Sequence, residues 1–363
     1  MNILLLTKTK SHLSLDYDAI EESVLRADNF FGGYYRAFIK MGHQVSVSCV
    51  ESTVISSKFK IKKPFISKII RGCLKVTGLY LFDKLLTSIF ISFLVKRKKI
   101  DFIFTELNST FYPNIIRRLF PNIVIAQWFG VFPDSNKALM KSIRHYDINF
   151  TPCIFADEVR STFFYGTDVY IGCAAEILPT NPNLNLRPKS NRLLFYGGIT
   201  KRHTARNDLL KKLGDSVDIF GYVESDVEQY FHEKCRGFIP ASNLYNLISE
   251  YKYALNIGLD GFQKIKVGHN NRLFEIAASG STLQFVERSD FVRDFFEDDE
   301  VIQFDDVEEL SKLIASFEKN EALRLQVCNR ALSRSRRYTY DARAQKIIDC
   351  VTALSARRGV PAC

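Results

Sequence analysis

YALNIGL at residues 253–259, followed by NNRLFEIAASG at 270–280 and STLQFVE at 281–287, is the stretch that decides the fold. The first and third pieces are short apolar runs typical of buried strands, and the piece between them has apolar residues at helical spacing. The helical pattern stops at Gly280, a common end for a helix. A strand, a helix and a second strand in this order form a β/α/β unit, in which the helix crosses between two parallel strands.

The same alternation of strand and helix patterns fills both halves of the 363-residue chain, which is long enough for two domains. Between the halves, residues 178–191 hold three prolines and four asparagines without apolar periodicity, which is typical of a linker. The pattern predicts an α/β protein with two Rossmann-like β/α/β domains that face each other across a cleft. The predicted parts are an N-terminal domain at 1–178, a linker at 179–191, a C-terminal domain at 192–340 and a helix at 341–363 that packs back on the N-terminal domain.

The formal charge of +10 is concentrated in one segment. Residues 58–99 hold twelve Lys or Arg and one acid, Asp83, a net of +11, so the rest of the chain sums to about −1. A nucleic-acid binder more usually spreads its positive charge over a face built from several segments, and the sequence therefore argues against that class. A confined basic segment favours a local anionic partner such as a membrane surface.

An uncharged run, LLTSIFISFLV at 85–95, lies inside this basic segment and ends in KRKK at 96–99. The run is too short to span a bilayer. Two interpretations stay open for it. It is an ordinary amphipathic helix with a solvated charged end, or a helix that rests on anionic lipid at the inner face of a membrane.

The cysteines and the N-terminus indicate a cytoplasmic protein. The eight cysteines lie far apart, with no CxxC pair and no zinc-like cluster of Cys and His. We interpret them as reduced, mostly buried thiols, as expected in the cytosol. The N-terminal MNILLLTKTK has too short an apolar run for a secretory signal and is typical of a first strand.

Two glycine pairs follow predicted strands. Gly32 and Gly33 lie between the first strand and its helix, and Gly197 and Gly198 end a strand in FYGGITKRHTARN. Glycines at such places let a backbone approach a ligand closely and leave helix N–H groups for an anion. Each pair is equally explained as a tight turn. Basic residues after the second pair suit a diphosphate or form a solvated loop; they are Lys201, Arg202 and Arg206.

Arg272 and Glu275 stand three positions apart near the start of the predicted helix at 271–280. Such a pair can be a surface ion pair, which contributes only about 0.2–0.5 kcal/mol. Alternatively, the carboxylate accepts both hydroxyls of a ribose while the guanidinium reaches phosphate oxygens.

The region around this pair resembles the C-terminal domain of GT-B glycosyltransferases. The similarity runs through YALNIGL, GHNNRLFEIAASGSTLQF, FFEDDEVIQFDDVEELSKLI and RALSRSRRYTYDARAQKII. It is greatest to CgeB-type proteins and more remote to the family-4-like group, the glycosyl transferases of group 1. FFGGYYRAFIKMGHQVSV is similar to the N-terminal glycine loop, helix and strand of the same enzymes. The resemblance covers most of residues 1–50 and 190–348, and it implies a GT-B fold and a nucleotide-sugar donor.

The resemblance also implies a donor site. Glu275 is similar to the glutamate that holds the nucleotide ribose, and Arg272, with Lys201 or Arg202, would lie at the diphosphate. No metal or cofactor is expected, because no DxD motif stands where a metal-dependent transferase needs one, and EDDE at 297–300 is typical of a solvated acidic turn. The other donor-binding residues implied are Gly32, Gly33, Gly198, Gly280 and Ser281.

The catalytic residues are less defined. Retaining members carry a second acid eight residues before the ribose glutamate, where this chain has Val267, so the stereochemical outcome stays open. An inverting enzyme needs a base that takes the proton of the acceptor hydroxyl. The candidates are Asp134, Glu106 and His269, although a helix cap or loop acid is the more common role for such acids and a structural role for a lone histidine.

The sequence thus predicts a cytoplasmic glycosyltransferase, peripheral on the inner membrane face. It would move a sugar from a nucleotide-diphosphate donor to a glycan or lipid-linked acceptor in envelope polysaccharide or glycoconjugate synthesis. Two alternatives stay open: a nucleotide-sugar epimerase of the same fold, and a degenerate nucleotide-sugar or glycan-binding protein. The missing acid at Val267 favours the binding protein.

Overall fold

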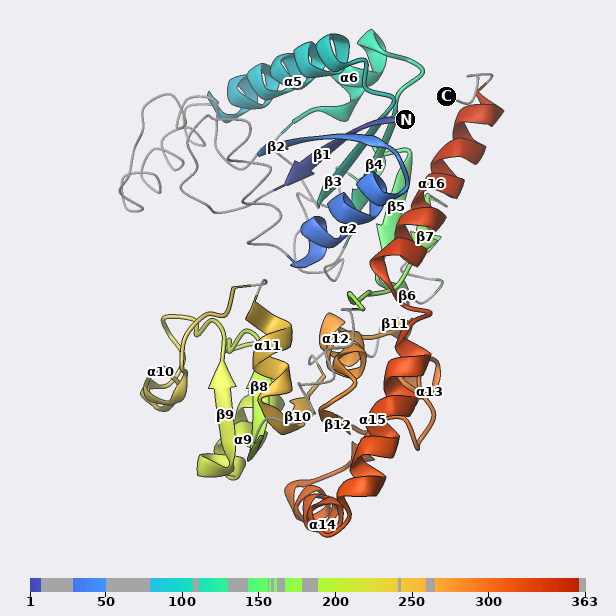
Figure 1. Cartoon of the computed structure of the whole chain (residues 1–363). Helices are drawn as coiled ribbons and strands as arrows, with labels where there is room; N and C mark the ends of the chain where they lie inside the picture. The colour runs from blue at the N-terminus through green and yellow to red at the C-terminus, as the bar shows by residue number, and fades with distance from the viewer. Residues whose placement is uncertain are drawn as a thin grey trace. The chain divides into compact units, whose positions relative to one another are not determined.

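The computed structural model divides the chain into two compact units (Figure 1). The N-terminal unit comprises Met1–Thr151, Asp157–Ile171 and Ala344–Cys363, and the C-terminal unit comprises Pro152–Ala156 and Gly172–Arg343. The end of the chain thus belongs to the N-terminal unit. The structure describes residues 1–7, 29–49, 79–106, 111–129, 143–155, 157, 160–161, 167–177, 189–240, 243–258 and 265–358.

The N-terminal unit is built on a six-stranded parallel sheet with the order β2-β1-β3-β4-β5-β7. The first strand lies one place from the edge, and the chain adds β2 on one side of it and the later strands on the other. All five residues of β4 are buried, as expected for a parallel strand covered on both faces. The strands are β1 Asn2–Thr7, β2 Gln44–Cys49, β3 Phe102–Glu106, β4 Val124–Trp128, β5 Ile148–Thr151 and β7 Asp168–Tyr170.

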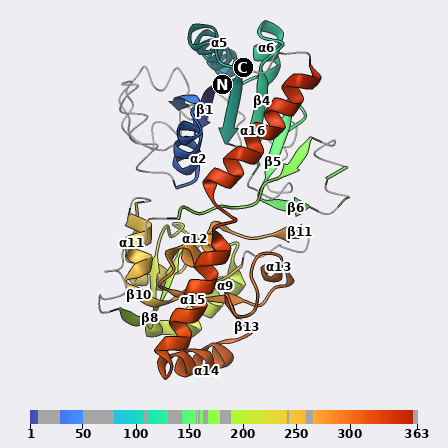
Figure 2. The same ribbon diagram turned by 45° about the vertical axis from the view of Figure 1, so that its right-hand side comes forward.

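Helices cover both faces of this sheet, with α5 and α6 on one face and α2 on the other (Figures 1 and 2). Ile91 of α5 and Ile116 of α6 join one hydrophobic cluster with side chains of the strands. On the opposite face, Phe31 of α2 stacks on Phe104 with ring centroids 5.4 Å apart. The helices are α2 Asn29–Lys40, α5 Leu79–Lys98, α6 Pro113–Leu119 and α16 Tyr340–Arg357, which begins in the C-terminal unit.

Gly32 and Gly33 lie inside α2 and not in a loop before it, which corrects the prediction from the sequence. The helix already begins at Asn29. The reason is that Phe31, Tyr34 and Phe38 follow helical spacing and are fully buried against the sheet. The apolar face that fixes the helix therefore includes the two glycines, which are themselves buried.

The C-terminal unit repeats this strand order in a five-stranded parallel sheet, β13-β12-β10-β8-β9. Its first strand, β8, again lies one place from the edge, with β9 outside it and β10 on its other side. A separate antiparallel pair joins β6 Cys153–Phe155 to β11 Ile265–Gly268. The sheet strands are β8 Ser190–Tyr196, β9 Val217–Phe220, β10 Tyr251–Asn256, β12 Leu283–Glu287 and β13 Ile302–Phe304.

Two hydrophobic clusters cover the two faces of this second sheet. Because side chains alternate along a strand, Phe195 of β8 joins the larger cluster with Leu210 of α9, whereas Tyr196 joins the smaller one with Ile276 of α12. The end of β8 therefore contributes one aromatic ring to each face. The helices are α9 Thr204–Leu213, α10 Gln229–Lys234, α11 Leu244–Ser249, α12 Asn271–Ser279, α13 Asp290–Arg293, α14 Val307–Glu318 and α15 Glu321–Ser335.

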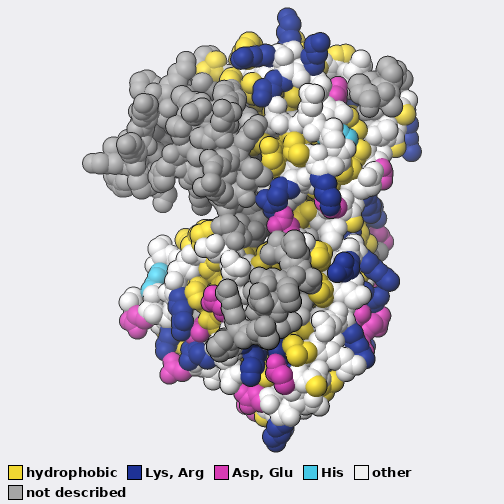
Figure 3. All heavy atoms as spheres, viewed as in Figure 1, with side chains coloured by type: hydrophobic (Ala, Val, Ile, Leu, Met, Phe, Trp, Pro, Cys, Tyr) yellow, Lys and Arg dark blue, Asp and Glu magenta, His cyan; other side chains and the backbone are white. Residues whose placement is uncertain are grey.

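The basic segment predicted at 58–99 is described from Leu79 onward, and residues 58–78 lie outside the described residues. In the space-filling view, Lys and Arg side chains lie beside hydrophobic ones over the α5 end of the N-terminal unit (Figure 3). None of the helices in the described part of the chain is long and apolar enough to cross a membrane.

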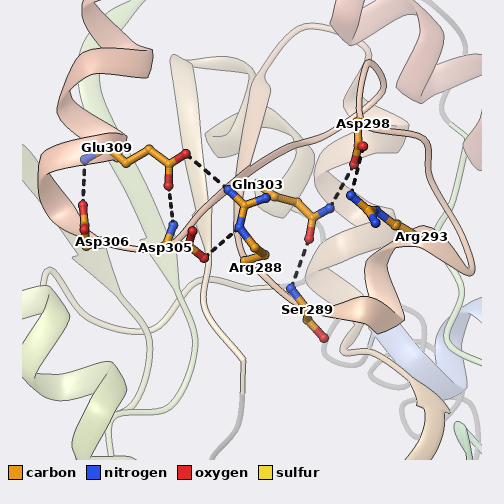
Figure 4. A network of polar contacts seen from close by, with 8 residues as sticks. All are labelled: Arg288, Ser289, Arg293, Asp298, Gln303, Asp305, Asp306 and Glu309. Atoms are coloured by element: carbon orange, nitrogen blue, oxygen red, sulfur yellow. Dashed lines mark hydrogen bonds and ion pairs between the residues drawn. The ribbon is translucent and has the colours of Figure 1, made fainter.

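Acidic residues near β13 are held by arginines (Figure 4). Asp298 forms an ion pair with Arg293 at 3.3 Å, and every acid of EDDE at 297–300 has an arginine partner. Asp306 caps α14 by accepting a hydrogen bond from the N–H of Glu309 at 2.8 Å, as is common for an aspartate at this position. The EDDE turn is thus ion-paired as well as solvated, and its acids anchor neighbouring helices.

Candidate functional site

The candidate site lies where the strand order of the C-terminal sheet reverses. The chain continues from β8 to β9 on one side and from β10 to β12 on the other, while β8 and β10 are neighbours. In open parallel sheets this arrangement leaves a crevice beyond the carboxyl ends of the strands, where ligands bind. The residues at these two strand ends are Tyr196, Gly197 and Gly198 of β8 and its loop, and Asn256, Ile257 and Gly258 of β10 and its loop.

Arg206 of α9 ties the two strand ends together. Its buried guanidinium donates hydrogen bonds to the carbonyl of Gly198 at 3.0 Å and to the carbonyl of Gly258 at 2.8 Å. Both of its terminal nitrogens, Nη1 and Nη2, thus donate to the backbone, and Arg206 positions the loops. In this, Arg206 differs from Lys201 and Arg202, two nearby cations in the sequence whose side chains are exposed.

Gly197 allows a guanidinium to lie directly against the end of β8. Its φ is 149°, a backbone conformation that favours glycine. A Cβ atom there would meet the guanidinium of Arg272 at 3.4 Å, and a Cβ on Gly221 would come within 2.2 Å of the carbonyl oxygen of Gly197. The two glycines therefore let the strand end and Arg272 pack without a side chain between them.

Arg272 is a buried cation in the first turn of α12. Its guanidinium carbon lies 4.7 Å from the ring centroid of Phe195 and 5.9 Å from that of Tyr196, within the range of cation–π contacts. In the part of the chain that the structure describes, its Nη1 is buried without a hydrogen-bond partner. Burial and the neighbouring Arg206 lower the pKa of Arg272 to about 9. Among the described residues, one nitrogen of this guanidinium, Nη1, is thus left without a hydrogen bond, while two aromatic rings contact the cation.

Glu275 is a buried carboxyl group one turn further along α12. It is 6% exposed, and its Oε2 accepts a hydrogen bond from the hydroxyl of Tyr196 at 2.9 Å. Burial raises the pKa of Glu275 to about 7. Both groups are buried, so they do not form the surface ion pair of the alternative interpretation. Among the described residues no ion pair at contact distance joins them, but the charge of each favours the ionised form of the other.

Replacing Glu275 with glutamine should stabilise the protein above neutral pH. The pKa of Glu275 is raised from 4.5 to about 7 in the folded protein, so the protonated carboxyl contributes stability at low pH. This contribution to the free energy of unfolding is lost as the pH rises from 4.5 to about 7, and it stays lost above that range. An amide has no such cost, so Glu275→Gln should raise the free energy of unfolding by roughly 3 kcal/mol near pH 8. No difference is expected near pH 4.5. Thermal unfolding at both pH values measures this, and a variant less stable than the wild type near pH 8 contradicts it.

The N-terminus of α12 is fixed by two asparagines. Asn270 caps the helix by accepting a hydrogen bond from the N–H of Leu273 at 3.3 Å, and its Nδ2 donates to Oδ1 of Asn256 at 2.9 Å. Asn256 is fully buried at the end of β10. This pair attaches the first turn of α12, with the partial positive charge of a helix N-terminus, to the strand end at the crevice.

His269, which precedes the cap, is neutral at physiological pH. Its Nδ1 accepts a hydrogen bond from the N–H of Asn270 at 3.0 Å, which places the ring proton on Nε2. Burial and the nearby Arg272 lower the pKa of His269 to about 4. The Nδ1 lone pair is in use and the ring is a weak base near pH 7, so the geometry argues against His269 as the catalytic base.

The other predicted cations lie in solvent on the loop after Gly198. Lys201 forms an ion pair with Asp226 at 2.9 Å, and both side chains are more than half exposed. Such a pair contributes about 0–1 kcal/mol, so a ligand anion can replace Asp226 at little cost. Arg202 is exposed. Among the predicted residues, the structure therefore brings Gly198, Arg272 and Glu275 to the reversal point.

The predicted carboxylates belong to the N-terminal unit. Asp134 lies outside the described residues. Glu106 is the last residue of β3, which pairs with β1 on one side and β4 on the other, and its side chain is not described. Because this sheet also reverses its order between β1 and β3, the backbone of Glu106 ends a strand at the reversal point of its own unit.

Gly280 and Ser281 lie at the opposite end of α12 from Arg272, which argues against the diphosphate contact predicted for their backbone N–H groups. Gly280 ends the helix in the left-handed conformation, with φ 63°, and its N–H donates to the carbonyl of Ala277. Ser281 is buried, and its carbonyl accepts a hydrogen bond from Arg324 at 2.8 Å. The amide predicted to bind a diphosphate is already used, because the helix end itself requires a glycine of this conformation.

Replacing Gly280 with alanine should affect stability and leave the site intact. The positive φ strains any other residue, and the new Cβ would come within 2.6 Å of Cδ2 of Leu332, a flexible side-chain end that can move. We expect Gly280→Ala to cost about 1–2 kcal/mol of unfolding free energy. Thermal unfolding and nucleotide titration of the same sample measure both effects. A folded variant that has lost nucleotide binding would contradict this expectation and show that Gly280 contributes to the binding site.

Three residues that shape the site were not predicted from the sequence. Tyr196 holds the carboxyl of Glu275, and Phe195 carries the guanidinium of Arg272. Asn256 fixes the cap of α12. All three lie at the carboxyl ends of strands whose existence was predicted, and an aromatic or polar residue at that position is the signal that could have found them.

Comparison with known proteins identifies the class of this fold. Residues 202–349 match a family model described as glycosyl transferase-like. The structure is similar to that of Anabaena Alr3699/HepE in complex with UDP and glucose, with a TM-score of 0.51, 12% identity, and coverage of 97% of this chain and 100% of the other. A glycosyltransferase from Rickettsia africae gives a TM-score of 0.56, 12% identity and coverage of 97% and 98%. Sucrose-phosphate synthase from Thermosynechococcus elongatus gives a TM-score of 0.56 and 10% identity, with coverage of 98% of this chain and 99% of the other. No curated protein sequence matches the chain.

The fold is that of the GT-B glycosyltransferases, with a parallel Rossmann-like sheet in each unit. The structural similarity confirms the predicted fold class. The glycosyl transferase-like model matches residues 202–349, which is less than half of the chain, and agrees with the predicted class of enzyme. The nearer resemblance to CgeB-type proteins stays a prediction from the sequence.

Proposed function

We propose that this protein moves a sugar from a nucleoside-diphosphate donor to a glycan or lipid-linked acceptor in envelope polysaccharide or glycoconjugate synthesis. The observation that carries the proposal is the pair of buried groups, Arg272 and Glu275, at the reversal point of the C-terminal sheet. A buried cation and a buried carboxyl without a direct ion pair are only partly compensated in the empty protein, because burial outweighs their mutual attraction in the pKa of each. A ligand that offers an anion to one and hydroxyl groups to the other satisfies both, and a nucleoside diphosphate has these groups side by side.

In this proposal Glu275 accepts the two hydroxyls of the donor ribose. Hydroxyl groups are hydrogen-bond donors and therefore suit an ionised carboxylate. The hydroxyl of Tyr196 orients that carboxylate through its bond to Oε2, at 2.9 Å. A ribose that supplies two further hydrogen bonds favours the ionised form and lowers the raised pKa of Glu275.

Arg272 donates to the diphosphate in the same proposal. A guanidinium presents two parallel N–H groups to phosphate oxygens, and in the folded protein Arg272 is already desolvated. The cost of removing its water is therefore part of folding and is not repeated on binding. The N–H groups at the start of α12 and the exposed side chain of Arg202 would add to the positive potential.

We infer a uridine nucleotide as the donor. Contacts to ribose and diphosphate are common to all nucleotides, so the support for uridine comes from Anabaena Alr3699/HepE, whose structure contains UDP and glucose and covers 97% of this chain. The sugar that is transferred is a hexose in the simplest form of the proposal.

The proposed reaction breaks the bond between the anomeric carbon and the diphosphate oxygen. Negative charge grows on the leaving UDP, and Arg272 with the N-terminus of α12 would stabilise it, a role that needs no metal ion. The acceptor hydroxyl forms the new bond to the anomeric carbon and loses its proton. If the enzyme inverts, a base takes that proton, and Glu106 at the end of β3 is the first candidate, followed by Asp134.

Two other functions of the same fold make different demands on the donor. A nucleotide-sugar epimerase consumes the donor without an acceptor. A degenerate binding protein holds the nucleotide without turnover, and Val267 in place of a second acid favours it over the epimerase.

We propose that the transferase acts on the cytoplasmic side of a membrane, where a lipid-linked acceptor is within reach.

An assay of donor turnover separates the three functions. The protein is incubated with UDP-glucose, UDP-galactose and UDP-N-acetylglucosamine, with and without lipid-linked glycan extract as acceptor, and the donor is followed by NMR. Transfer releases UDP only when acceptor is present and adds a sugar to the glycan. Changed donor without acceptor identifies the epimerase, and binding without change identifies the binding protein. No turnover and no nucleotide binding would remove the proposal.

A further inference from the structure

The outward face of α5 exposes large hydrophobic side chains. Five of the ten large hydrophobic side chains exposed in the described part of the chain belong to this one helix. Leu81 is 61% exposed, Ile89 53% and Phe93 56%. Positions four apart lie on one side of an α-helix, so these residues and Leu85 form a continuous apolar stripe. The full set is Leu81, Leu85, Ile89, Phe90 and Phe93.

The inward face of α5 is more polar than a buried face usually is. Thr87, Ser88 and Ser92 are buried there, beside the apolar residues that pack on the sheet. The hydroxyl of Ser88 donates to the carbonyl of Lys84 at 2.7 Å and accepts from the N–H of Tyr112 at 2.8 Å. The inward face thus combines these short hydroxyl side chains with Ile91, Leu94 and Val95, while the largest exposed apolar side chains lie on the outward face. A helix that only packs on its own domain would have polar side chains on that outward face.

Basic residues continue the stripe at the C-terminal end of α5. Arg97 lies four positions after Phe93, and Lys96, Lys98 and Lys99 flank it. All four cations are exposed, and Nζ of Lys98 bonds to the hydroxyl of Ser46 at 3.0 Å. Hydrophobic and basic side chains lie beside one another in this region (Figure 3). An apolar stripe joined to a cluster of cations matches the chemistry of an anionic lipid surface, with acyl chains beneath phosphate groups.

We propose that α5 docks this face on an anionic lipid bilayer, with the helix axis in the plane of the membrane. The stripe that includes Ile89 and Phe93 would enter the boundary between headgroups and acyl chains, and residues 96–99 would lie against lipid phosphates. The helix does not span the membrane, since it is neither long nor apolar enough. The basic residues favour a lipid surface over a second copy of the chain as the partner of this face. The same face of a second copy would present the same cations, whereas anionic lipid supplies the opposite charge. The proposal does not depend on the donor site.

Vesicle binding by two variants tests the proposal. Ile89→Ser with Phe93→Ser removes the centre of the stripe, and replacement of residues 96–99 by serine removes the cations. Wild-type protein should co-sediment with vesicles of phosphatidylglycerol and phosphatidylcholine but not with phosphatidylcholine alone, and salt should weaken the binding. We expect about a tenfold loss of affinity for the first variant and about a hundredfold loss for the second. Circular dichroism and UDP binding show that each variant is folded.

Matched substitutions in the C-terminal unit serve as controls. Phe238→Ser with Leu323→Ser removes two exposed hydrophobic side chains, which are 75% and 40% exposed, without touching α5. Serine at four exposed cations of the same unit, Lys212, Lys319, Arg336 and Arg337, controls for total charge. The control variants should bind vesicles as the wild type does.

Three results would overturn the proposal. The first is no binding of the wild type to anionic vesicles. The second is an equal loss of binding in the control variants, which would show that only total charge matters. The third is a dimer in sedimentation velocity that Ile89→Ser with Phe93→Ser dissociates while vesicle binding is unchanged, which would make the stripe a self-association surface. UDP binding is measured separately, so none of these results bears on the donor site.

Discussion

Methionine in place of Arg272 is expected to lower the affinity for UDP about a thousandfold, which corresponds to about 4 kcal/mol. The variant loses two charge-assisted hydrogen bonds to the diphosphate at a place from which water is already excluded. Its stability should not fall with its affinity. Methionine fills a similar volume beside Phe195 and Tyr196 and removes a buried charge that has no counter-charge in contact, so the unfolding midpoint should be unchanged or higher.

Two further substitutions make this experiment specific. Arg236 lies over the ring of Phe220 at 5.9 Å, much as Arg272 lies over Phe195, but it is paired with Asp218. Arg236→Met should therefore leave UDP affinity unchanged. Arg272→Lys keeps the charge without the planar fork and should recover only part of the affinity. UDP binding by Arg272→Met within about threefold of the wild type would show that the guanidinium does not contact the diphosphate.

Glutamine in place of Glu275 is expected to weaken UDP-glucose binding about a hundredfold near pH 8, through loss of two hydrogen bonds to a charged group. It should also abolish the pH dependence of binding. In the wild type the pKa of Glu275 is about 7, so its carboxyl gains a proton as the pH falls below that value, and the ribose hydroxyls lose their acceptor. Wild-type affinity should therefore rise between about pH 6 and about pH 8. UDP-glucose is the suitable ligand because its diphosphate, esterified at both ends, does not titrate in this range.

Calorimetric titration at the two ends of this pH range and at neutral pH measures both effects. Glu308→Gln, a change at an exposed acid in the first turn of α14, is the matched control and should retain wild-type affinity and pH dependence. The same glutamine at position 275 is expected to stabilise the protein near pH 8. A loss of binding together with a gain of stability cannot be explained by poor folding. If Glu275→Gln keeps the pH dependence of the wild type, the titrating group is another residue.

The order of strands and helices could be predicted because each has a local pattern. Buried parallel strands such as β1 contain continuous apolar runs, here residues 3–6, and α12 has a glycine at its end. The start of α2 could not be placed, because the glycine pair at 32–33 suggests a loop while the buried rings of Phe31 and Tyr34 fix a helix. The tertiary packing of two aromatic side chains outweighed a local turn signal.

The candidate site could be predicted only in part. Arg272 and Glu275 were found because they lie on one helical turn and resemble a family pattern, but their burial and their lack of mutual contact have no local signature. The hydrogen bond from Tyr196 to Glu275 joins residues 79 positions apart, so the local sequence around either residue does not predict it. Arg206 illustrates the opposite error, since a basic residue after a glycine pair suggests an anion while its guanidinium binds backbone carbonyls.

The run at 85–95 was recognised as a helix, but its orientation was not. Composition alone does not decide which side chains face the sheet, and the expected arrangement would bury the largest ones. The structure instead buries Ser88 and Ser92, because the hydroxyl of Ser88 accepts a hydrogen bond from the N–H of Tyr112 at the start of α6. This contact between two helices places Phe93 and Ile89 on the outward face, and the sequence of α5 by itself does not indicate it.

The central claim is that the N-terminus of α12 binds a nucleoside diphosphate. Calorimetric titration of the protein with UDP, GDP, ADP and CMP in the presence of a metal chelator, repeated with Glu275→Ala, tests it most directly. The account predicts that one nucleotide, UDP, binds selectively and that the substitution abolishes its binding. Binding of none of the four, or UDP binding that is the same in Glu275→Ala as in the wild type, would contradict it.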